Sequence, residues 1–249
     1  MKEARMYRVM VAAVLALGAA PALAEPTDVV VRVIAQDAKF VGSSMGGVRI
    51  VLRDPKSGTV LAEGLTEGGT GHTDRIMKSD GRSPLRADGS EAAFSATLGI
   101  TKPTLVELDA YGPVDYPESA VHVSQQRWVM PGESVTIGDG WTVELPGLVI
   151  DPRTSVAGLS VRISAKVMPM CGCPIAPDGL WPADEYEVNV SAWMDGSPLA
   201  RNKLAFDTSP GVFSGYVQLP TEGRYELMVF ARNTRTGNSG IRAIEVVAE

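Results

Sequence analysis

The residues best suited to chemistry lie in one short segment, Met168-Pro169-Met170-Cys171-Gly172-Cys173-Pro174. It holds both cysteines of the 249-residue sequence, one residue apart, with two methionines within three residues of them. Thiolates and thioethers are soft donors, which suit Cu(I) far better than hard cations. Cys171, Cys173, Met168 and Met170 are therefore the candidate ligands of a soft-metal site, and copper is the expected metal.

Two other interpretations of the cysteine pair stay open. One is a disulfide that only tightens the loop, because an exported protein with two cysteines usually pairs them. Gly172 eases so small a ring, since glycine readily adopts positive φ. The other is a redox-active pair that exchanges thiols, for which Lys166 is the nearby cation in the sequence. A packing role for the segment is also open, in which the methionine side chains only fill the core beneath the loop. In each case several prolines and glycines predict that residues 168–182 form a stiff, irregular loop between strands.

A second candidate site is the glycine-rich run 67–75, where His72 and Asp74 are the residues able to bind a ligand. The run lacks the Gly-Lys-Ser/Thr ending of a phosphate-binding loop, and no helix is expected after it. We therefore expect a loop between strands with an exposed His72. The other histidine, His122, lies in a strand-like run and is expected to be half-buried with its nitrogens bonded.

Composition and motifs argue against several classes of function. A net charge of −6 leaves no excess of basic residues for a nucleic-acid partner. Two histidines and two cysteines exclude a dense disulfide scaffold and a His-rich metal cluster. The run Gly42-Ser43-Ser44-Met45-Gly46 has the letters of a nucleophile elbow. However, that motif needs a strand, a turn and a helix, whereas this run connects two expected strands. We interpret it as a turn and predict no catalytic residue.

The N-terminal segment, residues 1–24, has the features of a secretory signal peptide. Basic residues precede an apolar run of 12 residues, 9–20, which is too short to span a bilayer. Ala22-Leu23-Ala24 then fits the small-x-small rule for cleavage before Glu25. We expect a mature protein that is exported to the periplasm, an oxidising compartment, and that has no integral membrane segment.

The remainder of the chain predicts strands. Apolar and polar residues alternate with period two, and Gly, Pro or Asp bound each run. The expected strands are 29–34, 48–53, 59–65, 93–98, 104–110, 134–137, 141–150, 159–167, 186–194, 203–206, 212–219, 224–231 and 241–247. The fold class is therefore all-β, with two β-sandwich domains at 25–150 and 158–249. Asp151-Pro152 has turn chemistry, which predicts a linker at 151–157.

Two stretches resemble known families. The strand Gly223-Arg224-Tyr225-Glu226-Leu227 and the turn Thr236-Gly237-Asn238-Ser239-Gly240 resemble the last hairpin of bacterial immunoglobulin-like domains. The resemblance implies that Tyr225 packs as a corner residue with its hydroxyl bonded to the backbone. Residues 47–71, with an Asp-Pro-x-x-Gly turn between two strands, resemble prealbumin-like and carboxypeptidase-regulatory-like modules. Neither family has a single function, so both resemblances imply fold alone.

These observations predict an exported, non-enzymatic accessory or binding protein with a Cys/Met centre for copper or redox chemistry. The alternative is a structural or adaptor module of immunoglobulin-like fold. In that case the sheet edges and loops bind a protein partner, and the pair Cys171 and Cys173 is only a disulfide staple.

Overall fold

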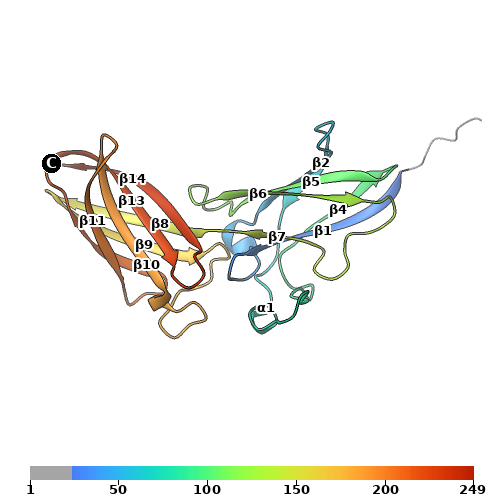
Figure 1. Ribbon diagram of the computed structural model, residues 1–249, viewed down its shortest axis with the longest axis horizontal. Coiled ribbons are helices and arrows are strands. Elements are labelled where there is room, and N and C mark those ends of the chain that lie inside the picture. Colours follow the sequence, from blue (N-terminus) through green and yellow to red (C-terminus); the bar gives the residue numbers. More distant parts are fainter. Residues whose placement is uncertain (1–23) are drawn as a thin grey trace, which may run out of the picture.

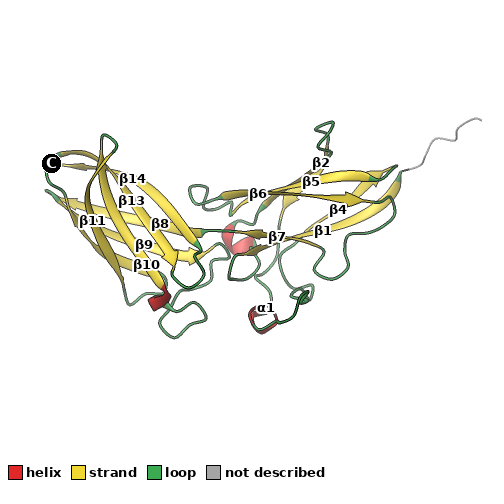
Figure 2. Cartoon of the chain, viewed as in Figure 1, coloured by secondary structure: helices red, strands yellow, loops and turns green. Residues whose placement is uncertain are grey.

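The computed structural model of the chain describes residues 24–249, whose regular secondary structure is almost entirely β-strand, joined by loops and three short helical segments (Figures 1 and 2). The all-β prediction is therefore confirmed. The predicted signal peptide falls on residues 1–24, and all of these except Ala24 lie outside the described residues. Within residues 24–249, no helix has the length and apolar composition needed to cross a bilayer.

The N-terminal half forms two sheets that pack face to face (Figure 1). Its strands are β1 (Glu25–Ala35), β2 (Arg49–Arg53), β3 (Val60–Leu65), β4 (Phe94–Ile100), β5 (Thr104–Gly112), β6 (Val121–Val129) and β7 (Trp141–Leu145). One sheet has the order β4-β1-β7, with β7 parallel to β1, and the other has the order β3-β2-β5-β6. Alternate residues fill the core between the sheets: Val31 and Val33 of β1 and Ile50 and Leu52 of β2 are fully buried.

The C-terminal half is one seven-stranded sheet folded into two layers. Its strands are β8 (Leu148–Ala157), β9 (Ser160–Pro169), β10 (Tyr186–Met194), β11 (Ser197–Phe206), β12 (Val212–Gln218), β13 (Gly223–Asn233) and β14 (Ser239–Ala248). β11 pairs with both β10 and β12, so it joins the layer β14-β13-β10 to the layer β12-β9-β8. Tyr225 is buried in β13, and its hydroxyl donates to the Thr221 carbonyl at 2.9 Å. The predicted corner residue is thus confirmed, and the arrangement is consistent with an immunoglobulin-like fold.

The crossing between the halves differs from the prediction. The expected strand 141–150 is two strands, because Pro146-Gly147 interrupts it where the chain leaves one sheet for another. The predicted linker 151–157 is wrong, since these residues belong to β8 and pair with β9. Pro152 fits there because β8 is an edge strand, where a missing N–H costs no ladder bond.

Smaller corrections concern loops and short helices. Residues 134–137 form no strand, and Val135 makes an isolated bridge instead. Where no helix was expected, α1 (Thr73–Met77) begins within the glycine-rich run 67–75 and extends past its end; η1 (Ser43–Met45) and η2 (Ala183–Glu185) are 3-10 turns. His122 is not half-buried: its side chain is 56% exposed and bonds Asp109 through Nε2 at 2.6 Å.

Candidate functional site

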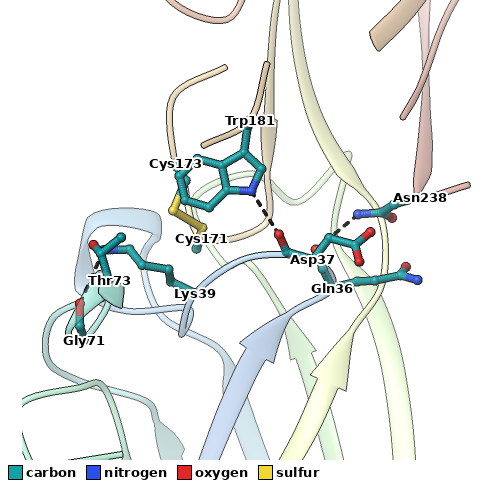
Figure 3. Close-up of a disulfide and its surroundings, with 9 residues drawn as sticks. All are labelled: Gln36, Asp37, Lys39, Gly71, Thr73, Cys171, Cys173, Trp181 and Asn238. Carbon is teal, nitrogen blue, oxygen red and sulfur yellow. Dashed lines mark hydrogen bonds between the residues drawn. A yellow bond between two sulfur atoms is a disulfide. The ribbon is translucent and has the colours of Figure 1, made fainter. Parts of the chain in front are cut away.

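The Cys-Gly-Cys segment lies in the loop between β9 and β10, where the two halves meet (Figure 3). Cys171 and Cys173 are joined in a disulfide, with their Cα atoms 5.5 Å apart. Gly172 allows this turn: its φ is +76°, and its N–H donates to the Pro169 carbonyl at 2.8 Å. The cysteines are 1% and 5% exposed, so the disulfide is almost completely buried.

Three methionines surround this loop, and sequence reasoning named only two of them. Met168 and Met170, the predicted ligands, are both buried. Met168 lies in β9 opposite Val149, while the terminal methyl of Met170 lies over Gly147. The third is Met45 of η1, whose sulfur would be 2.5 Å from a Cβ added to Gly172. A thioether from the N-terminal half therefore lies against the residue that separates the two cysteines.

Sequence reasoning missed Met45 because it lies in the Gly42–Gly46 run that was interpreted as a turn. The turn itself is confirmed: η1 ends at Gly46, which has a φ of 75°. Nothing in the local pattern indicates that this turn contacts the cysteine loop. The signal available was only the residue type, a soft thioether followed by two glycines.

An open pocket of about 300 Å³ exposes one side of the disulfide loop. Its lining comes from both halves: Lys39, Ser44, Thr70, Thr73, Cys171, Gly172, Cys173, Pro174, Leu180 and Trp181. The cation in this pocket is Lys39, whereas the predicted Lys166 is exposed on β9. The ammonium of Lys39 donates to Thr73 Oγ1 at 3.0 Å and to the Gly71 carbonyl at 3.3 Å. Partial burial lowers the pKa of Lys39 from its ordinary value.

The structure brings the two predicted sites close together without using the predicted residues of the second. The glycine-rich run contributes Thr70 and Thr73 to the pocket wall. His72 and Asp74 are exposed and do not line it. Asp74 pairs with Lys78 at 2.8 Å across one helical turn, and the hydrogen bond from Lys78 lowers the pKa of this carboxyl.

Two hydrogen-bonded side chains hold the halves together around this loop (Figure 3). The indole N–H of Trp181 donates to the Asp37 carbonyl at 2.9 Å, which fixes the cysteine loop to the turn after β1. Asn238 lies in the turn between β13 and β14; its side-chain amide donates to the Gln36 carbonyl at 3.4 Å and to the Gly147 carbonyl at 3.1 Å. Its side-chain oxygen accepts the Gly147 N–H at 2.7 Å. Trp181 thus ties the cysteine loop to the turn after β1, and Asn238 ties the turn between β13 and β14 to that same turn and to Gly147.

The donor set restricts the chemistry of this site. Among the described residues, no group of three or more His, Cys, Asp or Glu side chains is arranged to hold a metal ion. The disulfide offers no anionic sulfur, so the oxidised pair is a poor metal site. After reduction the cysteines supply thiolates, and any further soft ligand must be a thioether.

A separate groove lies on the outer face of the C-terminal half. It has a volume of about 530 Å³ and is lined by β10, β11 and β13. Met228 and Phe230 form one apolar wall, and Arg201 lies across from them. At the end of the groove, the Trp193 indole N–H donates to Ser191 Oγ at 2.8 Å, which fixes the ring.

Comparisons with known proteins assign no family. No family model and no curated protein matches the chain. Three solved structures are similar in outline. A DUF3823 family protein from Bacteroides ovatus is 9% identical, with a TM-score of 0.34, over 90% of this chain and 100% of its own.

The second structure, the chicken interferon gamma receptor alpha chain, is 11% identical, with a TM-score of 0.31, over 91% of this chain and 99% of its own. The third, a candidate carbohydrate binding protein from Bacteroides uniformis, is 8% identical, with a TM-score of 0.29, over 89% and 98%. At such TM-scores none of them carries an argument about function.

Proposed function

We propose that this chain is an exported, non-enzymatic accessory protein that binds Cu(I) through Cys171 and Cys173 once their disulfide is reduced. The observation that carries the proposal is the grouping of soft donors around one loop. Both cysteines of the loop line an open pocket, and the Met45 thioether, which is not part of the pocket lining, lies against Gly172 between them. Two thiolates and a thioether match the ligand preference of Cu(I).

In the alternative role, a structural staple, this disulfide would add little to the stability of the fold. It closes a loop of only three residues, Cys171 to Cys173. In the chain-entropy model such a loop adds about 1.6 kcal/mol to stability, far below the gain from long loops. Trp181 and Asn238 already hold the surrounding chain by hydrogen bonds. The chemistry of the sulfur atoms is therefore the better reason for the pair.

Loading requires a reductant, and a small dithiol is the simplest. It transfers two electrons to the disulfide through a mixed disulfide, becomes a disulfide itself and leaves thiols on Cys171 and Cys173. Cu(I) binding then releases both thiol protons, because the ligand is the thiolate. The resulting centre carries one net negative charge, which the Lys39 ammonium in the same pocket offsets.

An anaerobic titration tests the proposal. The protein is reduced with a dithiol, freed of it, and titrated with Cu(I) in competition with a chromophoric Cu(I) chelator. We expect about one Cu(I) per chain for reduced protein and none for oxidised protein or for the double variant Cys171→Ser, Cys173→Ser. Zn²⁺ should bind less tightly, because neutral thioethers contribute little to it. The proposal fails if reduced wild type binds Cu(I) no better than the double variant.

A second candidate function is the adaptor with a protein partner, which the groove on β10, β11 and β13 favours. Arg201 in this groove has no ion-pair partner among the described residues. Together with the apolar wall, it fits a protein segment that offers apolar side chains and a carboxylate. Phe230→Ser should abolish binding of such a partner. Tyr216→Ser, a change of an exposed aromatic residue outside the groove, should leave binding intact. Equal binding by both variants would exclude the groove.

We also propose that the chain is exported to the periplasm. A disulfide between Cys171 and Cys173 is typical of proteins in an oxidising compartment, which supports a periplasmic location. N-terminal sequencing of the protein recovered from the periplasm should begin at Glu25. A mature chain that retains residues 1–24 would contradict the cleaved signal.

A further inference from the structure

We infer that Met45, a residue of the N-terminal half, is the third copper ligand, so that Cu(I) binding bridges the two halves of the chain. The inference rests on the proposed function and adds a ligand that lies far from the cysteines in the sequence. Met45 is 3% exposed, and its sulfur is directed at Gly172 rather than at solvent.

The backbone around Met45 is held on both sides. Its N–H donates to the Gly42 carbonyl at 3.0 Å, and its carbonyl accepts the Asp115 N–H at 3.1 Å. Gly46 then turns the chain with a φ of 75°. The thioether is thus presented from a fixed turn, as a preorganised ligand should be.

Gly172 is what lets this sulfur lie against the peptide between the cysteines. Any Cβ at that position would come within 2.5 Å of the Met45 sulfur, so only glycine leaves room for the thioether. The same residue separates Cys171 from Cys173 by one position. The absence of a side chain there therefore serves both the turn and the approach of a third donor.

The methionines next to the cysteines in the sequence are less well placed. Met170 directs its terminal methyl at Gly147, in the connection between β7 and β8. Met168 is part of the β9 ladder opposite Val149. Both are buried, and packing accounts for both. Met45 is the thioether that lies against the peptide between the cysteines.

A bridging ligand gives copper binding a structural consequence. The cysteines belong to a loop of the C-terminal half, and Met45 belongs to a turn of the N-terminal half. A Cu(I) ion bound to all three sulfurs would add a cross-link at the junction that Trp181 and Asn238 already define. Reduced protein should therefore resist proteolysis at the junction better with Cu(I) than without it.

Matched methionine variants test the inference. Met45→Leu and Met168→Leu each replace a buried thioether with a side chain of similar volume. X-ray absorption at the copper edge should report three sulfur ligands in wild type and in Met168→Leu, and two in Met45→Leu. Met45→Leu should also weaken Cu(I) binding at least about tenfold. Unchanged circular dichroism and thermal midpoint confirm that each variant is folded.

The outcomes separate the two claims. If Met45→Leu keeps three sulfur ligands and wild-type affinity, Met45 is not a ligand and the inference is overturned. If wild type itself shows two sulfur ligands, the cysteine site stands and only the inference fails. If reduced wild type binds no Cu(I), the proposed function fails, and the inference fails with it.

Discussion

Replacing Gly172 with alanine should destabilise the protein through two separate effects. Gly172 has a φ of +76°, a conformation that costs a residue with a side chain about 1 kcal/mol or slightly more. The new Cβ would also lie 2.5 Å from the Met45 sulfur, and overpacking of this kind costs about 1–3 kcal/mol. Gly172→Ala should therefore lower the free energy of unfolding by about 2–4 kcal/mol.

The turn between β10 and β11 offers a matched control. Gly196 has the same φ of +76°, but nothing lies within 4 Å of a Cβ at that position. Gly196→Ala should thus cost only the backbone part, about 1 kcal/mol. Urea denaturation of both variants, followed by tryptophan fluorescence, gives the two values, and their difference measures the steric effect of Met45.

A double variant measures the coupling between positions 172 and 45 directly. Met45→Ala removes the side chain that the new methyl group meets, so Gly172→Ala should cost less in that background than in wild type. The coupling free energy between the two sites should be about 1 kcal/mol or more. If Gly172→Ala costs no more than Gly196→Ala, and Met45→Ala changes nothing, the contact between the halves at Gly172 is refuted.

Three single substitutions each remove or alter one hydrogen-bonding group and test its contribution to the fold. Tyr225→Phe removes the corner bond to the Thr221 carbonyl and should lower the free energy of unfolding by about 1 kcal/mol in urea melts; no loss would contradict the corner role. Trp181→Phe leaves the Asp37 carbonyl without its indole donor and should speed proteolysis at the junction of the halves, whereas an unchanged cleavage rate would contradict its role there. Burial alone would raise the pKa of Glu91, but hydrogen bonds from the backbone and Arg32 hold it below its ordinary value. Its stabilisation is therefore present above about pH 4.3 and lost as the pH falls through the depressed pKa. The stability gap between wild type and Glu91→Gln should shrink in acid melts, and a gap that stays constant from neutral pH to pH 3 would refute this.

Local patterns in the sequence were enough to predict most of the fold. Alternation of apolar and polar residues marks strands directly, and β10 begins and ends as predicted, at Tyr186 and Met194. The resemblance to immunoglobulin-like domains implied the corner role of Tyr225, and the bond that confirms it is local, to Thr221 four residues earlier. The turn at Asp151-Pro152 was misjudged because a proline on an edge strand looks the same in the sequence as a proline in a linker.

The site could be predicted only in part. Cys171 and Cys173 are separated by a single residue in the sequence, so their pairing is a local feature. Lys39 lines the pocket beside the cysteines, and Met45 contacts Gly172. Both residues belong to the other half of the chain, and only the packing of the two halves brings them to the cysteine loop. Met170 is near the cysteines in the sequence, yet its side chain ends over Gly147. Proximity along a chain does not determine which side chains share a surface.

The most direct test of a Cu(I) site at Cys171 and Cys173 is the amount of copper that the protein binds before and after reduction. Thiol content and bound Cu(I) are measured on the oxidised protein, on the protein reduced anaerobically with a dithiol, and on the reduced double variant Cys171→Ser, Cys173→Ser. A Cu(I) site formed by the reduced cysteines predicts no thiols and no copper in the first sample, two thiols and about one tightly held Cu(I) in the second, and no copper in the third. Two free thiols without tightly bound Cu(I) in the reduced wild type would contradict it.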